Sequence, residues 1–125
     1  MRLLVTGDRV WNDPDMIFMT IAKRQHRIQE VCQGGAAGAD IMAFGACRDM
    51  HIICKTFPAQ WKLYGRAAGP IRNQQMLDEF KPTQVFAFHD NLEASKGTKD
   101  MVRRAKKAGI PVRLFSHSHP EGQDL

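Results

Sequence analysis

The sequence lacks the features that would place the protein in a membrane or outside the cell. No apolar run approaches the ~20 residues that a membrane-spanning helix requires. Met1 and Arg2 lead directly into a short apolar stretch that is typical of a strand, not of a signal peptide. We therefore expect a cytoplasmic protein without a membrane partner.

Cysteine is also scarce. Cys32, Cys47 and Cys54 are the three cysteines of the chain, and they show no CxxC spacing. An odd number without metal-ligand spacing is typical of reduced thiols and not of a disulfide framework or a zinc site. We expect no metal site and no cofactor.

Two common nucleotide-binding signatures are absent. No Gly-Lys-Ser or Gly-Lys-Thr sequence occurs, which excludes a Walker A loop. The first predicted strand-to-helix turn has one glycine, Gly7, and no acidic residue ends the second predicted strand, so the dinucleotide fingerprint of nicotinamide dehydrogenases is missing. Aromatic and basic residues are not interleaved as on surfaces that bind single-stranded nucleic acids.

What is present is a chain of 125 residues, enough for one domain, with a net charge of +5. The surplus of positive charge is compatible with an anionic ligand, either a nucleotide or a nucleic acid. Much of the surplus lies within residues 103–107, where a solvated helix face explains it without any partner. Net charge alone therefore does not choose between these functions.

Apolar runs alternate with helical patterns along the chain. Helix signals include Asp13 before Pro14 at one start and Gly109 after one end. This order predicts an α/β fold, a Rossmann-like three-layer sandwich with a five-stranded parallel sheet and helices on both faces. The predicted strands are 2–6, 31–33, 51–57, 85–88 and 111–115; the predicted helices are 14–30, 40–50, 70–81 and 98–108, with an irregular loop at 58–69.

The domain is predicted to span residues 2–115, and residues 116–125 are predicted to form a flexible tail. That last segment is polar and contains Pro120 and Gly122. Chain ends of this composition are commonly disordered.

The most informative segment is the glycine-rich loop, residues 33–40, between the second predicted strand and its helix. Its glycines and alanines leave the backbone almost bare. A bare turn at a helix start lets several N–H groups point at one anion, and the helix dipole adds about half a positive charge. A phosphate-binding loop and a tightly packed turn without ligand both fit this segment.

Glycines and arginines gather where several predicted strands end. In doubly wound sheets the ligand crevice lies beyond the carboxyl ends of the strands, at the switch in strand order. Segments 7–9, 34–40, 61–73 and 97–98 all follow predicted strands, which favours one shared site for an anionic ligand.

Side-chain chemistry suggests individual roles at this site. Arg72 in a first helical turn suits bidentate phosphate capture, or else a salt bridge. Trp61 can stack on a base or pack under the loop, and Thr98 can bind phosphate or cap its helix. Asp40 is a cap, a group for ribose hydroxyls, or the candidate catalytic carboxylate, for which Asp8 is the second choice. The predicted ligand-binding residues are Gly7, Arg9, Gly34, Gly35, Ala36, Gly38, Asp40, Trp61, Arg72, Asn73, Gly97 and Thr98.

The segments 6–11, 34–40, 57–61 and 65–77, together with the pair Gly97-Thr98, resemble the YspA/YpsA-related branch of the SLOG superfamily. Lonely Guy phosphoribohydrolases and the DNA-processing protein A family belong to the same superfamily. The resemblance covers residues 2 to 115 and implies a Rossmann-like fold, binding of a nucleotide or nucleotide derivative, and self-association. It implies no particular reaction.

The chain departs from this family pattern at two places. Ala37 stands where family members often carry an arginine, so a phosphate contact is missing or supplied elsewhere. Asp100 is a poor match to the catalytic acid that follows the glycine–threonine loop of the phosphoribohydrolases, and that role is not transferred.

The leading prediction is a protein that binds a nucleotide-derived small molecule, as a sensor, a sequestering protein or an N-glycosidic-bond hydrolase. The alternative is a module for single-stranded nucleic acid of the DNA-processing type. Met16, Phe18 and Met19 flank the buried stripe of the first helix, and with the resemblance they favour a homodimer or higher homo-oligomer.

Overall fold

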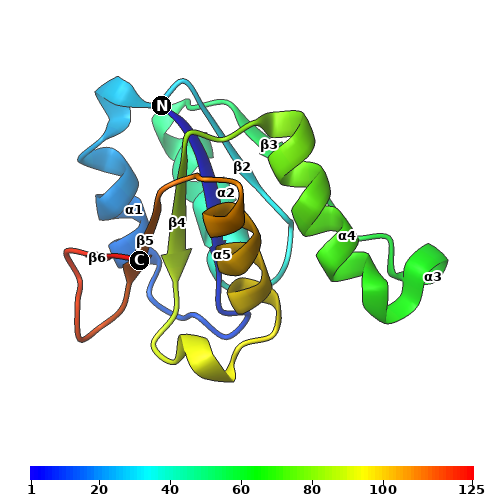
Figure 1. Ribbon diagram of the computed structural model, residues 1–125. Coiled ribbons are helices and arrows are strands. Elements are labelled where there is room, and N and C mark those ends of the chain that lie inside the picture. The colour runs from blue at the N-terminus through cyan, green and yellow to red at the C-terminus, as the bar shows by residue number, and fades with distance from the viewer.

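The computed structural model describes all residues, 1–125, and shows a mixed, mostly parallel sheet with helices around it (Figure 1). The strand order is β3-β2-β1-β4-β5-β6. Five strands are parallel, and the sixth pairs antiparallel with β5. The strands are β1 Arg2–Gly7, β2 Glu30–Gln33, β3 Cys54–Thr56, β4 Gln84–Phe88, β5 Val112–Phe115 and β6 Gln123–Asp124.

The strand order reverses between β1 and β4. The chain first builds the sheet outward from β1 to β2 and β3, then returns to place β4 on the other side of β1. Gly7 at the end of β1 is paired with Phe88 at the end of β4. The carboxyl ends of the two central strands therefore lie side by side at the position where such sheets bind ligands.

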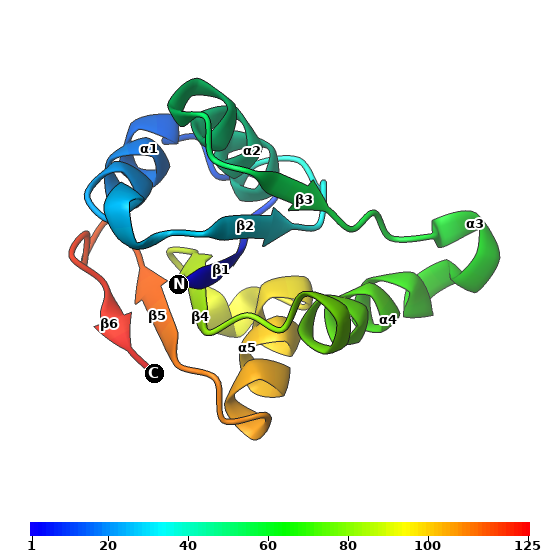
Figure 2. The ribbon, with the colours of Figure 1, turned by 90° about the horizontal axis from the view of Figure 1, so that it is seen from above.

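Helices cover both faces of the sheet, α1 and α2 on one and α4 and α5 on the other (Figure 2). Short 3₁₀ turns occur at Gln25–Arg27, Gly65–Ala67 and Leu92–Ala94, and a π-helical turn Met76–Phe80 continues α4. The helices are α1 Pro14–Ala22, α2 Ala39–Met50, α3 Trp61–Tyr64, α4 Ala68–Gln75 and α5 Gly97–Lys107. None of them is long and apolar enough to cross a lipid bilayer.

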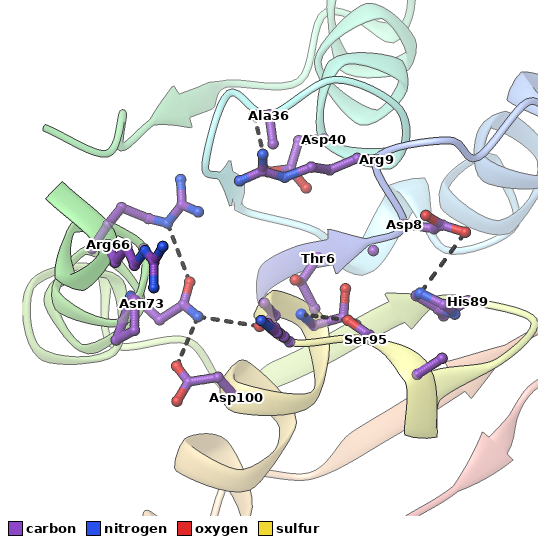
Figure 3. A pocket seen from close by; sticks show the side chains of 18 of the residues that line it. Thr6, Asp8, Arg9, Ala36, Asp40, Arg66, Asn73, His89, Ser95 and Asp100 are labelled. Carbon is purple, nitrogen blue, oxygen red and sulfur yellow. Dashed lines mark hydrogen bonds and ion pairs between the residues drawn. The ribbon is translucent and has the colours of Figure 1, made fainter. Parts of the chain in front are cut away.

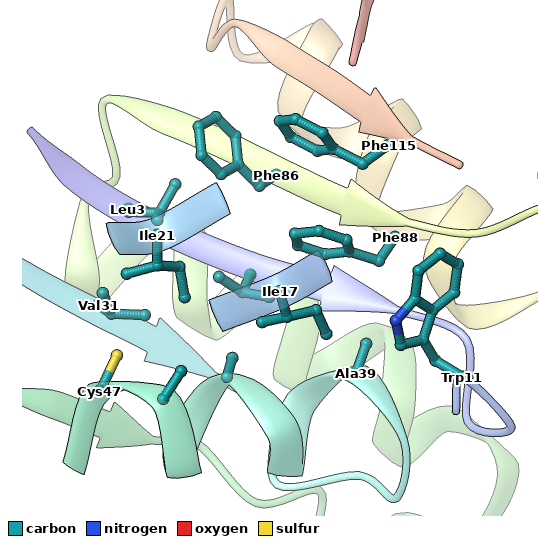
Figure 4. Packing of buried hydrophobic residues seen from close by; sticks show 13 residues of the cluster. Leu3, Trp11, Ile17, Ile21, Val31, Ala39, Cys47, Phe86, Phe88 and Phe115 are labelled. Atoms are coloured by element: carbon teal, nitrogen blue, oxygen red, sulfur yellow. The ribbon is translucent and has the colours of Figure 1, made fainter. Parts of the chain in front are cut away.

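The core consists of two apolar clusters that the sheet separates. Alternate residues of β1 point to opposite clusters: Leu3 and Val5 to the side of α1 and α2, Leu4 to the side of α4 and α5. Phe86 and Phe115 pack edge to face in the first cluster, with ring centroids 4.9 Å apart (Figure 4). Burial on both faces explains why the strands are continuous apolar runs.

The first helix is shorter than the sequence predicts. It ends at Ala22, whereas the prediction extended it to residue 30. After the buried Ile17 and Ile21, residues 23–27 contain no apolar side chain that could continue the stripe onto the sheet. Ile28 packs against the core from the following turn instead.

Two further boundaries differ from the prediction. Strand β3 covers only Cys54–Thr56, because His51 takes a left-handed conformation that ends α2. The segment 58–69, predicted to be irregular, contains α3 and the start of α4. Pro70 lies in the first turn of α4 and not at its first position.

The prediction of five parallel strands is corrected by the chain after β5, which adds β6. Residues 116–125, predicted to be a flexible tail, turn back so that Leu114 pairs with Gln123. The Arg113 side chain donates hydrogen bonds to the Glu121 carbonyl and pairs with Asp124 at 2.8 Å. Strand β6 is held by these contacts of Arg113 and not by an alternation of apolar residues, so the polar sequence of residues 116–125 did not predict it.

Candidate functional site

A cleft of about 870 Å³ opens at the carboxyl ends of β1 and β4 (Figure 3). This volume lies in the range of small-molecule sites. Most of the predicted ligand-binding residues line it: Gly7, Arg9, Ala36, Asp40, Trp61, Arg72, Asn73, Gly97 and Thr98. Gly34 and Gly35 line a smaller adjoining hollow of about 210 Å³, and Gly38 lines neither space.

The glycine-rich loop uses its first N–H groups within the protein. The amides of Gly34 and Ala36 donate to Asp40 Oδ2, at 3.1 and 3.3 Å, and the Gly35 amide donates to the Gln33 side chain. A phosphate cradle formed by these three amides is therefore not what the structure shows. The amides of Ala37 and Gly38, and that of Asp40 in the first turn of α2, donate to no protein acceptor.

Close packing explains two of the loop glycines. A Cβ on Gly34 would overlap the Arg72 guanidinium, and a Cβ on Gly38 would overlap the Asp8 carbonyl. Gly38 also has a φ of 78°, which L side chains rarely adopt. At both positions the missing side chain lets the loop pack against protein atoms.

Arg72 joins the loop to the neighbouring strand end. Its Nη1 donates to the carbonyl oxygens of Gly34 at 2.7 Å and Phe57 at 3.3 Å, and its Nε donates to Asn73 Oδ1. Burial lowers the pKa of the guanidinium, while the charge of Asp40 opposes that shift. Nη2 makes no hydrogen bond to the protein, so Arg72 has one nitrogen left for a ligand.

Asn73 connects α4 to the start of α5. Its Nδ2 donates to the Gly97 carbonyl at 3.3 Å and to Asp100 Oδ2 at 3.0 Å. Burial opposes ionisation of Asp100, but hydrogen bonds from Arg104 and Asn73 hold its pKa below the usual value. Both side chains line the cleft, yet their polar atoms are engaged with each other and with Arg72, Gly97, Arg103 and Arg104.

The N-terminus of α5 is open toward the cleft. Ser95 Oγ accepts the Thr98 amide at 3.0 Å and so caps the helix in place of Thr98. The amides of Gly97 and Lys99 have no protein acceptor. Free amides at a helix start, beside the exposed Lys96, form a favourable environment for an anion.

The outer wall of the cleft carries positive charge and an aromatic ring. The Arg9 guanidinium lies over the Trp61 ring, 5.5 Å from its centroid, and Trp61 is 47% exposed. Arg66 projects from the turn after α3. Arg9, Arg66 and Lys96 form no salt bridge with any carboxylate.

Asp40 is a nearly buried carboxyl group whose environment favours its neutral form. Burial raises its pKa to about 6, against the opposing effects of the Ala36 and Gly34 amides and of Arg72. Asp40 Oδ2 already holds the loop, so this residue supports the wall of the cleft.

Two residues at the floor of the cleft lie outside the predicted ligand-binding list: Asp8, which the sequence offered only as an alternative catalytic carboxylate, and His89, which was missed. Asp8 directly follows β1 and His89 directly follows β4. Each is the first polar residue beyond the carboxyl end of a central strand. That position in the sequence could have identified both as candidates for the site. The predicted list instead followed glycines and arginines.

The comparison with known families agrees with this architecture. Residues 1–64 match the YspA, cpYpsA-related SLOG family. The chain is also 35% identical over 122 residues to the Gene 61 protein of Mycobacterium phage D29, covering 91% of this chain and 95% of the phage protein. The chain belongs to the YspA, cpYpsA-related SLOG family, which confirms the resemblance found in the sequence.

Solved structures share the fold at low sequence identity. A UDP-N-acetylglucosamine 2-epimerase aligns with a TM-score of 0.56 and 17% identity over 91% of this chain. The UDP-GlcNAc 2-epimerase from Neisseria meningitidis aligns with a TM-score of 0.53 and 20% identity over 92% of it. The chain spans about a third, 32%, of either epimerase, and the likeness shows a Rossmann-like α/β fold.

Proposed function

We propose that the protein binds a nucleotide or a nucleotide-derived phosphate ester in the cleft at the carboxyl ends of β1 and β4. The observation that carries this proposal is a set of exposed cations without carboxylate partners, Arg9, Arg66 and Lys96, around one cleft. Unpaired cations beside free helix amides lower the energy of a bound phosphate.

The aromatic ring supports a nucleotide over a simple phosphate. Trp61 is half exposed at the mouth of the cleft, and Arg9 lies over its ring. A base can stack on such a ring, and base–aromatic stacking contributes about 1–3 kcal/mol. The cleft of about 870 Å³ has room for a base, a sugar and phosphate together.

The carboxylates of the cleft favour binding over turnover. Asp40 holds the glycine-rich loop, and Asp100 is bound by Asn73 and Arg104. If the protein cleaves an N-glycosidic bond, Asp8 is the carboxylate with a free oxygen facing the cleft. We propose a sensor or sequestering role first and a hydrolase second.

Calorimetric titration with nucleoside 5′-monophosphates and the matching nucleosides tests the proposal. Lys96→Ala and Arg66→Ala should each weaken the monophosphates by roughly 10-fold, equivalent to ~1.4 kcal/mol, and leave the nucleosides unchanged. Lys107→Ala removes the same charge from the exposed far end of α5 and should change neither affinity.

Two outcomes would contradict this function. If no nucleotide binds, the cleft is not a nucleotide site. If a single-stranded oligonucleotide binds more tightly than any mononucleotide, and the affinity falls steeply with salt, the nucleic-acid alternative is correct.

A further inference from the structure

The floor of the cleft holds a hydrogen-bond acceptor and a donor that have no close partner. The Asp8 amide donates to the Phe88 carbonyl at 2.9 Å, which fixes Asp8 beside the end of β4. Asp8 Oδ1 accepts the Val10 amide at 3.1 Å. Asp8 Oδ2 lies 3.8 Å from His89 Nε2, too far for a hydrogen bond.

The backbone determines which nitrogen of His89 carries the proton. The Asn91 amide donates to Nδ1 at 2.9 Å, so Nδ1 is an acceptor and the proton of the neutral ring is on Nε2. The imidazole is nearly buried, with a side-chain exposure of 10%. His89 therefore offers one N–H, beside one free carboxylate oxygen of Asp8.

The end of the cleft that holds Asp8 differs in charge from the end that holds Arg66. Figure 3 shows Arg66 on one side of the cleft and the pair Asp8 and His89 on the other. A phosphate close to Asp8 would be repelled by its carboxylate. The group that fits here is uncharged and can both donate and accept a hydrogen bond, and a sugar hydroxyl does both.

We propose that Asp8 and His89 bind the 2′-hydroxyl of the ligand's ribose and make the protein selective for ribonucleotides over deoxyribonucleotides. This hydroxyl accepts from His89 Nε2 and donates to Asp8 Oδ2. The dinucleotide-binding Rossmann folds place the acidic residue for this task after the second strand. In this chain the acidic residue follows the first strand. This inference rests on the proposed nucleotide function and specifies the sugar.

The test compares each ribonucleoside 5′-monophosphate with its 2′-deoxy counterpart by ¹⁵N-resolved NMR titration, which also shows whether each variant is folded. The wild type should bind the ribose form at least about 10-fold more tightly, because a hydrogen bond to a charged group contributes ~1.5–3 kcal/mol. Asp8→Asn, which keeps an acceptor for the Val10 amide, and His89→Phe should weaken the ribose form to the level of the deoxy form. Both variants should leave the deoxy form within about 2-fold.

Lys96→Ala is the matched contrast, because it should weaken ribose and deoxy forms equally. The inference is wrong if the wild type binds the two sugars equally, or if Asp8→Asn and His89→Phe weaken both forms to the same extent. Either result leaves nucleotide binding itself intact. Failure of every monophosphate to bind would overturn the proposed function together with the inference.

Discussion

Arg72 illustrates how one side chain can serve both the fold and the ligand. From the sequence, this guanidinium was expected to contact phosphate directly. In the structure two of its nitrogens hold the carbonyl oxygens of Gly34 and Phe57 and the side chain of Asn73. Only Nη2 is free for a ligand, so substitutions at Arg72 act on the loop as well as on the site.

Arg72→Ala should lower the free energy of unfolding by roughly 1–3 kcal/mol, because it leaves the buried acceptors on Gly34 and Phe57 without a donor. It should also weaken nucleosides and nucleotides alike, since the loop loses its support. Urea denaturation and calorimetric titration measure the two effects.

Arg66→Ala is the control for this prediction, because Arg66 is exposed and forms no salt bridge. It should leave the free energy of unfolding unchanged and weaken phosphorylated ligands alone. A stable Arg72→Ala variant that had lost only phosphate affinity would show that the loop does not depend on this guanidinium.

Asp40 leads to a prediction about pH. Because burial raises its pKa to about 6, the group is largely ionised at pH 7.5 and largely protonated at pH 5. The ionised form repels a bound phosphate, so affinity should rise as the pH falls through 6, by at most about 10-fold per pH unit for one proton. ADP-ribose is a suitable probe because its phosphate diesters do not titrate in this range.

Asp40→Asn keeps an acceptor for the loop amides and should remove the pH dependence. An unchanged pH profile in this variant would assign the effect to another group. The same raised pKa means that ionising Asp40 costs stability. Its contribution to the free energy of unfolding is therefore largest below its unfolded value of 3.8 and is lost as the pH rises through about 6.

At the scale of elements, the segment after β5 is held by one histidine between two carboxylates. His117 Nδ1 lies 2.7 Å from Asp90 Oδ2 and Nε2 lies 2.9 Å from Asp13 Oδ2, and the ring stacks on Trp11. Asp13 also accepts the Met16 amide at the start of α1. The chain end, the loop after β4 and the first helix therefore meet at His117.

This junction predicts a pH-dependent stability. Hydrogen bonds with Asp90 and then Asp13 raise the pKa of His117 above its ordinary value of 6.5, so the contribution of the charged ring to the free energy of unfolding is fully present below pH 6.5. It is lost as the pH rises through the raised pKa. Urea denaturation between pH 5.5 and 8.5 should show wild type and His117→Gln converging as the pH increases.

Asp13 and Asp90 set the lower limit of the pH range in which this junction stabilises the protein. The Met16 amide and His117 lower the pKa of Asp13, and the His117 amide and ring lower that of Asp90. Their contribution is therefore present above 3.8 and is lost as the pH falls through the lowered pKa values. If the difference in free energy of unfolding between the wild type and His117→Gln grew as the pH increased, a charged His117 would be contradicted.

The helices and strands differ in how far the sequence could predict them. Apolar strands such as 85–88, buried on both faces, and the start of α1 at Asp13 and Pro14 were predictable, because local sequence determines them. The end of α1 and strand β6 were not. The first depends on where the apolar stripe stops, and the second on Arg113 contacting residues of the turn.

For the molecule as a whole, the location of the candidate site could be predicted but its internal bonding could not. Glycines and arginines after parallel strands indicated the cleft, because strand ends converge at one edge. That the amides of Gly34 and Ala36 are taken by Asp40 depends on a loop folding back on its own helix. No pattern in the sequence reports such a contact.

Self-association stays a prediction, but the structure changes which apolar residues support it. Met16 and Phe18 pack partly against the core, whereas Met19 is 52% exposed. Ile41 and Phe44 on α2 are exposed as well, at 53% and 43%. Burial of these exposed side chains of α1 and α2 against a second copy is the contribution to self-association that the structure suggests.

Strand β6 also bears on how these molecules behave in a concentrated solution. An uncovered sheet margin presents free amides and carbonyls that recruit strands from other chains and lead to aggregation. At one margin β6 occupies the rim of β5 with only two residues, one of them the acidic Asp124. The opposite margin, β3, is three residues long and carries Lys55. Short, charged outer strands give a foreign chain little to pair with, so the fold of this small protein is protected against polymerising through its own sheet.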